Sequence, residues 1–319
     1  PPAARWGALL LREERVAIAV PRRRRLFGRG ARQPGAAREA LVGYAFVFVP
    51  MAVFLVFFIY PMGYAVYISR FDWGILGPLE KVGWDNYSKL WHDTLFRRAI
   101  KNTIEYTLWV VPAQMALGLL MAVVLNQRIR FRTFFRGAFY FPALASSAAI
   151  VAIAIYLLNI DGLVNHILGI HKAWFFDTKT ALHAITVLNA WTTAGTMMLF
   201  YLASLQAIPT DVYEAAAIDG AGPWRQFWKI TFPLLKPGHF FVAVVSIIGA
   251  MKVFDQMYIV SRGTGGPAYS TYTAVLYIYN TAIRDAQLGL AAAAGVVLFV
   301  VIFAFTIIQW AFFGRQEAG

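Results

Sequence analysis

Six long apolar stretches divide this chain, and each is at least about 20 residues long. A helix rises about 1.5 Å per residue, so about 20 apolar residues cross a hydrocarbon layer of about 30 Å. The stretches do not alternate apolar and polar residues, which favours helices over the strands of a β-barrel. They cover residues of about 43–68, 102–125, 138–158, 181–205, 240–260 and 286–313. The pattern predicts an all-α membrane protein with six transmembrane helices, bent where prolines stand at positions 50, 61 and 112.

The composition supports a membrane protein, because 59% of the 319 residues are hydrophobic and only 14% are charged. Cysteine is absent, which excludes disulfide frameworks and thiolate metal sites within this sequence. The net charge is +13, but ten arginines fall within the first 42 residues. This excess belongs to a tail and does not indicate a nucleic-acid-binding domain.

Four arginines and no acidic residue lie between positions 126 and 137, in the segment that joins the second and third stretches. Lys and Arg near the ends of membrane spans collect on the cytoplasmic side. This segment and the arginine-rich tail are therefore predicted to be cytoplasmic, with both termini and residues 206–238 on the same side. The predicted organisation is a cytoplasmic tail (1–42), a transmembrane domain (43–313) of the cell inner membrane and a short cytoplasmic C-terminus (314–319).

The segment between the fourth and fifth stretches, residues 206–238, has the pattern of two short helices joined by a tight turn. Asp211 is placed to cap the first helix, with Glu214 reaching back in a capping box. Gly220 can take the positive φ of a helix end. Pro223 suits the first turn of a second helix, and Pro233 is expected to stop that helix.

Small and aromatic side chains give the two predicted helices different surfaces. Alanines at 215–217 strip the first helix of bulk, so another protein could approach its backbone closely. In the second helix Trp224, Phe227 and Trp228 are spaced to form one aromatic face. Two interpretations stay open: a loop that packs back on its own spans, or a docking surface for a partner.

The loop also resembles a family, the membrane subunits of binding-protein-dependent ABC importers. Their signature is Glu-Ala-Ala, three residues, Gly, nine residues, then Ile-x-Leu-Pro. This chain has Glu214-Ala215-Ala216, Gly220, Ile230 and Pro233 at those spacings, with Phe232 at the usual Leu position. The resemblance implies that the loop is a coupling helix that docks on a cytoplasmic ATPase. The residues expected to make that contact are Asp211, Glu214, Ala215, Ala216, Asp219, Gly220, Ile230 and Pro233.

Further stretches resemble carbohydrate importers, and in particular the first permease of glycerol-phosphate and maltose-type systems. The matching runs are Tyr60-Pro61, Trp84-Asp85-Asn86-Tyr87, Asn102-Thr103, Phe141-Pro142, Phe254-Asp255-Gln256-Met257-Tyr258 and Thr264-Gly265-Gly266-Pro267. The resemblance implies a second, related permease, an ATPase dimer that binds ATP and Mg, and an external sugar-binding protein as partners. It implies no cofactor in this chain, and transport by alternating access.

Charged residues inside the fifth stretch are candidates for the substrate path. Lys252 and Asp255 are three residues apart, so a continuous helix would place them on one face. Each ion near the bilayer centre costs about 2.5 to 3.5 kcal/mol, so both should pair or face a watery cavity. Our hypothesis is that Asp255, Gln256, Tyr258 and Lys252 border a sugar path; the alternative is an ion pair that only fixes helix register.

Polar residues in two other stretches are weaker candidates. The fourth stretch carries Asn189, Trp191, Thr192 and Thr193, and such residues cement helix packing as well as line pathways. Gln114 in the second stretch is a further candidate for the path.

Enzymatic motifs are missing from the sequence. It has no phosphate-binding loop of the Gly-x-x-x-x-Gly-Lys-Ser/Thr type, and its five histidines show no metal-ligand spacing. We therefore expect a non-catalytic sugar-importer permease without a metal site. The rival interpretations are a proton-coupled secondary transporter that uses Lys252 and Asp255, and an intramembrane enzyme acting on lipids.

Overall fold

The computed structural model describes residues 36–127 and 129–313. The predictions for the arginine-rich tail before residue 36, for Arg128 and for residues 314–319 lie outside the described residues. The chain divides into two compact units, Pro1–Phe58 and Ile59–Gly319. Each unit is described by itself.

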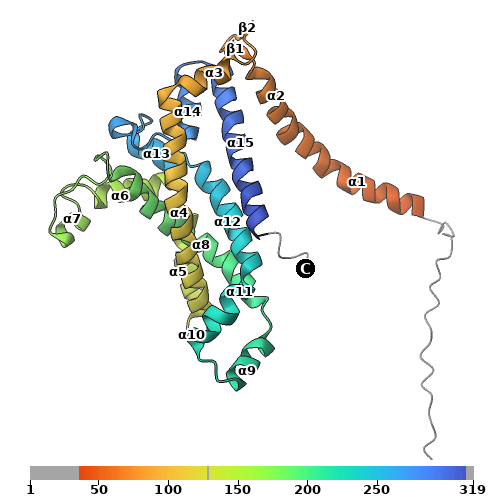
Figure 1. The fold of residues 1–319 in the computed structure, drawn as a ribbon, viewed down its shortest axis with the longest axis vertical. Coiled ribbons are helices and arrows are strands. Elements are labelled where there is room, and N and C mark those ends of the chain that lie inside the picture. Colours follow the sequence, from red (N-terminus) through yellow and green to blue (C-terminus); the bar gives the residue numbers. More distant parts are fainter. Residues whose placement is uncertain (1–35, 128, 314–319) are drawn as a thin grey trace, which may run out of the picture. The chain divides into compact units, whose positions relative to one another are not determined.

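The described part of the first unit is helical (Figure 1). It consists of α1 (Ala36–Phe54) and the first residues of a π-helical turn, η1 (Leu55–Ile59). Residues 36–42 are therefore part of a helix, and the segment that is long and apolar enough to cross a membrane begins at Leu41, next to the predicted end of the tail at residue 42. The side chains of residues 41–50 are exposed and largely apolar, which suits contact with lipid.

The second unit begins with Ile59, the last residue of η1, and α2 (Tyr60–Ile68). Pro61 lies in the first turn of α2, directly after the π turn. Proline has no N–H to donate and crowds the preceding turn, so a departure from α geometry is expected there. At Pro50 and Pro112 the helices continue without interruption.

The other elements of this unit follow in chain order. They are β1 (Phe71–Gly74), β2 (Gly77–Lys81), α3 (Asp85–His92), α4 (Thr94–Asn126), α5 (Arg132–Leu144), α6 (Ser147–Leu157), α7 (Leu163–Leu168), α8 (Ala181–Gln206), α9 (Thr210–Ile218), α10 (Pro223–Gln226), η2 (Phe227–Thr231), α11 (Phe232–Leu234), α12 (Lys236–Met251), α13 (Asp255–Ser261), η3 (Pro267–Tyr269), α14 (Ala274–Tyr279), η4 (Asn280–Arg284) and α15 (Leu288–Phe313).

The all-α prediction is wrong for the segment before α3, where β1 and β2 form an antiparallel hairpin. Gly74 pairs with Gly77 across a two-residue connection, and Gly77 has a φ of 120°. A glycine tolerates this conformation without steric strain, so the chain can reverse within two residues.

Four helical segments of the described chain are long and apolar enough to cross a membrane: Leu41–Ile68, Thr94–Asn126, Lys236–Ser261 and Leu288–Ala311. A fifth is counted if α5 and α6 together make one span. The remaining predicted span corresponds to α8, a helix of 26 residues and thus about 39 Å long. Its polar centre around Asn189 and Thr193 lowers its hydropathy, so six spans stay a prediction.

The third predicted span is not a straight helix over 138–158, because α5 and α6 meet at an angle of 92°. The helix starts earlier, at Arg132, and breaks at Ala145 and Ser146, which have extended backbones. Pro142 lies three residues before the break, and its missing N–H removes a hydrogen bond from the end of α5.

The second predicted span begins eight residues earlier than expected, at Thr94. Asp93 caps α4 by accepting hydrogen bonds from the backbone N–H groups of Leu95 and Phe96, at 2.7 and 3.3 Å. The basic residues at 97, 98 and 101 therefore lie on the first turns of a helix and not in a loop.

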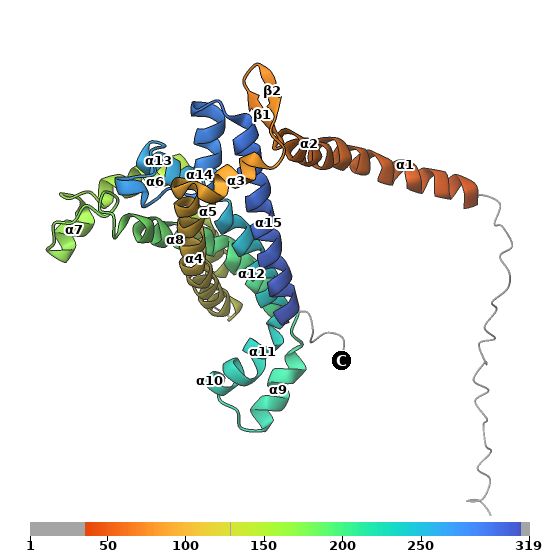
Figure 2. The same cartoon turned by 45° about the horizontal axis from the view of Figure 1, so that its top comes forward.

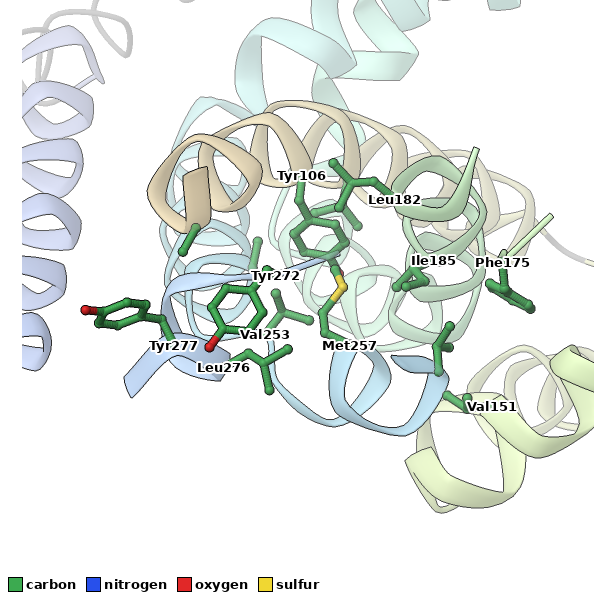
Figure 3. Close-up of a cluster of buried hydrophobic side chains, with 14 of the residues drawn as sticks. Tyr106, Val151, Phe175, Leu182, Ile185, Val253, Met257, Tyr272, Leu276 and Tyr277 are labelled. Carbon is green, nitrogen blue, oxygen red and sulfur yellow. The ribbon is translucent and has the colours of Figure 1, made fainter. Parts of the chain in front are cut away.

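Figure 3 shows buried side chains that join several helices of the second unit. They include Tyr106 of α4, Ile185 of α8, Met257 of α13 and Leu276 of α14. This cluster fixes the chain on both sides of a helix break that follows α12.

Candidate functional site

A cavity of about 290 Å³ lies between α4, α8, α12 and the segment after α12. Five residues predicted from the sequence line it: Gln114, Asn189, Lys252, Asp255 and Gln256. The other lining residues are Val110, Thr193, Met197, Val245, Ser246, Gly249, Ala250, Val253 and Phe254. Side chains from three separate stretches of sequence therefore meet at one place.

One wall of this cavity is a hydrogen-bonded pair of helices. The Thr193 hydroxyl donates to Gln114 Oε1 at 2.6 Å, and it also lies 2.7 Å from the backbone carbonyl of Asn189. Asn189 Nδ2 donates to the Tyr106 hydroxyl. Gln114 and Asn189 are both buried, so these bonds hold their amide groups in fixed positions.

The opposite wall is a break in the fifth apolar stretch. Lys252 lies at the C-terminal end of α12, and Asp255 is the first residue of α13. The prediction that they share one helix face is wrong, because residues 252–254 are not helical. The Thr273 hydroxyl donates to the carbonyl of Val253 at 3.3 Å and so holds this non-helical segment.

The break explains why the fifth apolar stretch can contain the charged side chains of Lys252 and Asp255. A cation at a helix C-terminus and an anion at a helix N-terminus are both stabilised by the helix dipole. Both side chains are exposed to the cavity, and within the described residues no ion pair joins Lys252 to Asp255. Broken helices whose polar ends face a cavity are typical of substrate sites in transporters.

Two predicted path residues lie elsewhere. Tyr258 packs against the rings of Phe254 and Tyr279, with centroid distances of 5.2 and 5.3 Å. Trp191 lines a separate apolar cavity of about 430 Å³, together with residues such as Leu158 and Val187.

Two residues at this site, Tyr106 and Ser246, were not predicted from the sequence. The Ser246 hydroxyl lies 3.2 Å from Met197 Sδ in the cavity wall. Tyr106 stands eight residues before Gln114, two helical turns away, and that spacing could have associated the two residues. Nothing comparable in the sequence marks Ser246.

The predicted coupling loop is a second candidate site, at the far end of α8 and α12 (Figures 1 and 2). Its helices are α9, α10 and α11, with the π-helical η2 between the last two. The prediction for Gly220 is confirmed by its φ of 74°, and the prediction that Pro223 occupies the first turn of α10 is also confirmed.

Two local predictions in the loop are wrong. Asp211 does not cap α9, because the N-cap position is Pro209 and Asp211 lies inside the first turn. Its carboxylate instead interacts with the helix dipole. The prediction for Pro233 is wrong by one residue, because α11 continues to Leu234; the wider η2 turn, which ends two residues before Pro233, accommodates the missing N–H.

The signature residues of the loop are mostly open to solvent. Glu214, Ala215, Asp219, Gly220 and Pro233 are exposed, Ile230 is half-buried and Ala216 is buried. Ile218, at the end of α9, is 87% exposed. The Tyr213 and Thr231 hydroxyls are 3.0 Å apart and tie the two arms of the loop together. The loop thus presents α9 outward as a braced projection.

The aromatic face of the loop turns toward the bundle. Trp228 lies 5.8 Å from Trp224 and 5.0 Å from Phe227 between ring centroids. These rings line an apolar cavity of about 1010 Å³ together with Leu119 and Val123 of α4. The aromatic arm therefore faces its own spans across an open cavity while α9 stays uncovered, and both interpretations of the loop stay open.

Residues that could hold a metal ion do not gather in the described parts of the chain. No group of three or more His, Asp or Glu side chains there is arranged to bind one.

Comparison with known proteins identifies the family. Residues 114–316 match the family described as "Binding-protein-dependent transport system inner membrane component". The lactose transport system permease protein LacF of Rhizobium radiobacter is 35% identical over 249 residues, which cover 76% of this chain and 83% of LacF. The arabinooligosaccharides transport system permease protein AraP of Bacillus subtilis is 35% identical over 263 residues, covering 80% of this chain and 83% of AraP.

A solved structure shares the fold. A chain of a bacterial ABC transporter involved in the import of the acidic polysaccharide alginate matches with a TM-score of 0.76 at 22% identity, covering 88% of this chain and 97% of that chain. The chain therefore belongs to the inner membrane components of binding-protein-dependent transport systems and is a permease component of an ABC transporter, a non-catalytic membrane subunit.

Proposed function

We propose that this chain forms part of the sugar path of an ATP-driven importer, together with a second, related permease. LacF and AraP, which match most of the chain, are named for the transport of lactose and arabinooligosaccharides. The cavity at the helix break presents amides of Gln114 and Gln256 and the carboxylate of Asp255. Such groups accept and donate hydrogen bonds to sugar hydroxyls. An external sugar-binding protein would deliver the substrate.

In this proposal the projection formed by α9 docks on a cytoplasmic ATPase dimer, which binds ATP and Mg. The observation that carries it is the exposure of Glu214, Ala215 and Ile218 on a braced helix beyond the ends of α8 and α12. A partner docked on α9 would remove the apolar side chain of Ile218 from water. The loop and both termini would then be cytoplasmic, and α8 and the bent α5–α6 pair would complete six spans in the inner membrane.

The test is a bulky substitution on the exposed side of α9. Ala215→Trp should reduce copurification of the ATPase and uptake of labelled sugar at least about tenfold, which corresponds to about 1.4 kcal/mol of lost contact free energy. Ala152→Trp, at an exposed alanine of α6, is the matched control and should leave ATPase binding unchanged. Equal ATPase binding by wild type and Ala215→Trp would contradict the proposal.

A further inference from the structure

A second polar cavity, of about 660 Å³, lies where α4 begins and where the chain enters α8. Arg97, Arg98 and Lys101 of α4 line it together with Lys179 and His183, and Glu105 is the acidic residue among its lining residues. The side chains of the two arginines and two lysines are exposed, and within the described part of the protein none of them forms an ion pair. Like charges that line one cavity repel one another, so an anion bound there would be favoured.

The floor of this cavity also has an unused hydrogen-bonding group. Ser270 is buried, with 7% of its surface exposed, and its hydroxyl has no hydrogen-bond partner among the described residues. Asn102 holds the chain around it by donating to the carbonyls of Tyr269 and Tyr272, at 2.8 and 3.0 Å. A hydroxyl donor that lines the same cavity as two guanidinium groups matches the oxygens of a phosphate group, which arginine binds with paired hydrogen bonds.

The basic cavity is separate from the cavity at the helix break. Gln114 lies nine residues after Glu105, which is half a turn around α4 at about 100° per residue. A ligand held by the arginines therefore sits on the opposite face of α4 from the proposed sugar path.

An apolar groove adjoins the basic cavity. His183 lines both, and the groove of about 430 Å³ continues along α8 past Val187 to Trp191. Val187 and Trp191 are 70% and 51% exposed. On α4 the same face that carries Lys101 presents exposed Leu108 and Trp109. Cationic groups at the end of an apolar helix, above apolar side chains, lie at the depth of lipid headgroups.

We propose that this surface binds an anionic phospholipid, with the phosphate in the basic cavity over Ser270 and an acyl chain in the groove along Val187 and Trp191. The basic cavity suits a phosphate group. The apolar groove beside it suits an acyl chain, so the proposed ligand is a lipid and not a soluble phosphate ester. Trp191 then contacts lipid and not sugar.

The test measures lipid retention by the full chain in detergent, using native mass spectrometry with phosphatidylglycerol and phosphatidylcholine as probes. Wild type should prefer phosphatidylglycerol, and the double variant Arg97→Gln/Arg98→Gln should reduce that preference about 25-fold, at about fivefold per basic residue. Lys81→Gln/Lys89→Gln removes the same charge outside the cavity and is the matched control. Equal preference in both double variants would overturn the proposal.

Two further measurements separate the source of the phosphate and guard against misfolding. Glycerol phosphate at millimolar concentration should not displace phosphatidylglycerol; full displacement would assign the cavity to soluble phosphate and overturn the lipid assignment. On wild type alone, raising the salt concentration should lower the preference for phosphatidylglycerol, because salt screens exposed charges. A preference that does not depend on salt would overturn the site even if the arginine variant failed to fold.

Discussion

The carboxylate of Asp93 joins two distant parts of the chain. One oxygen accepts the backbone N–H groups that begin α4, and the other accepts the Tyr277 hydroxyl of α14 at 2.6 Å. Burial of the phenol and the neighbouring carboxylate both raise the pKa of Tyr277. The hydroxyl therefore stays protonated and donates at physiological pH, so that one acidic residue fixes the start of α4 against α14.

Asp93→Ala should destabilise the protein by about 2 kcal/mol or more, because it removes a helix cap and a charged hydrogen-bond acceptor together. Thermal unfolding in detergent measures this, with Asp72→Ala in the hairpin as a control at an exposed aspartate. Since the Tyr277 pKa is raised on folding, its contribution is complete below about pH 10 and is lost as the pH rises through the folded pKa. Equal unfolding midpoints for both variants would contradict this role.

The carboxylate of Asp255 lies at the start of α13 and lines the cavity at the helix break. Asp255→Asn keeps the size of the side chain but removes the charge at the start of α13, and we expect sugar uptake to fall about tenfold with the complex still assembled. Asp285→Asn, at an exposed aspartate after η4, should leave uptake unchanged. Unchanged uptake in Asp255→Asn would show that this residue does not border the sugar path.

A separate variant tests the rival interpretation. Sugar uptake that survives deletion of residues 214–220 would favour a proton-coupled transporter.

At the scale of elements, α4 and α8 approach each other very closely at Gly118. A Cβ atom added there would lie 2.6 Å from Met197 Cβ, which is closer than real side chains come. This contact lies one helical turn beyond Gln114, so it sets the distance across which Thr193 bonds to Gln114. Small residues at such crossings are the usual basis of tight packing between membrane helices.

Gly118→Ala should therefore destabilise the protein by about 1 to 3 kcal/mol through overpacking, and transport should weaken with it. Gly137→Ala is the matched control, because a Cβ at that position of α5 meets no atom within 4 Å. The midpoint of thermal unfolding distinguishes the two variants. A Gly118→Ala protein as stable as Gly137→Ala would show that the helices separate without cost.

The length and apolarity of the helices could be predicted from the sequence, but their interruptions could not. Apolar runs located α4, α8 and α15 because their composition must match the bilayer. The 92° turn follows Pro142, but a proline does not by itself predict such a bend, because the helices continue without interruption at Pro50 and Pro112. The break after Lys252 depends in addition on long-range contacts, such as the bond from Thr273 to Val253.

At the scale of the molecule, the candidate site joins residues that are more than a hundred positions apart. Gln114, Asn189 and Asp255 were each identified in the sequence by a polar side chain in an apolar run, yet no spacing rule connects them. Only the packing of α4, α8 and α12 brings them to one cavity. The loop could be anticipated better, because its turn depends on local residues such as Gly220 and Pro223.

The aromatic arm of the loop, with the rings of Trp224, Phe227 and Trp228, connects the loop to the rest of the molecule in the proposed function. Trp228→Ala should leave ATPase binding through α9 intact but lower sugar uptake about tenfold, because the rings facing α4 would no longer transmit the position of the loop. Trp224→Ala, where the ring is 76% exposed, should have a smaller effect. Equal effects of the two variants, or loss of ATPase binding in Trp228→Ala, would contradict this role.

The tight crossing at Gly118 joins α4 and α8 into one unit, which we expect to move relative to α13. Helices in such contact cannot slide past each other without a clash, so α4 and α8 must reorient as one rigid lever that carries Gln114, Thr193 and Asn189 together. In the proposed transport cycle, opening and closing would then involve residues 252–254, where the helix is interrupted. Spin labels on α4 and α8 should keep a constant separation through the transport cycle, while labels on α4 and α13 should not.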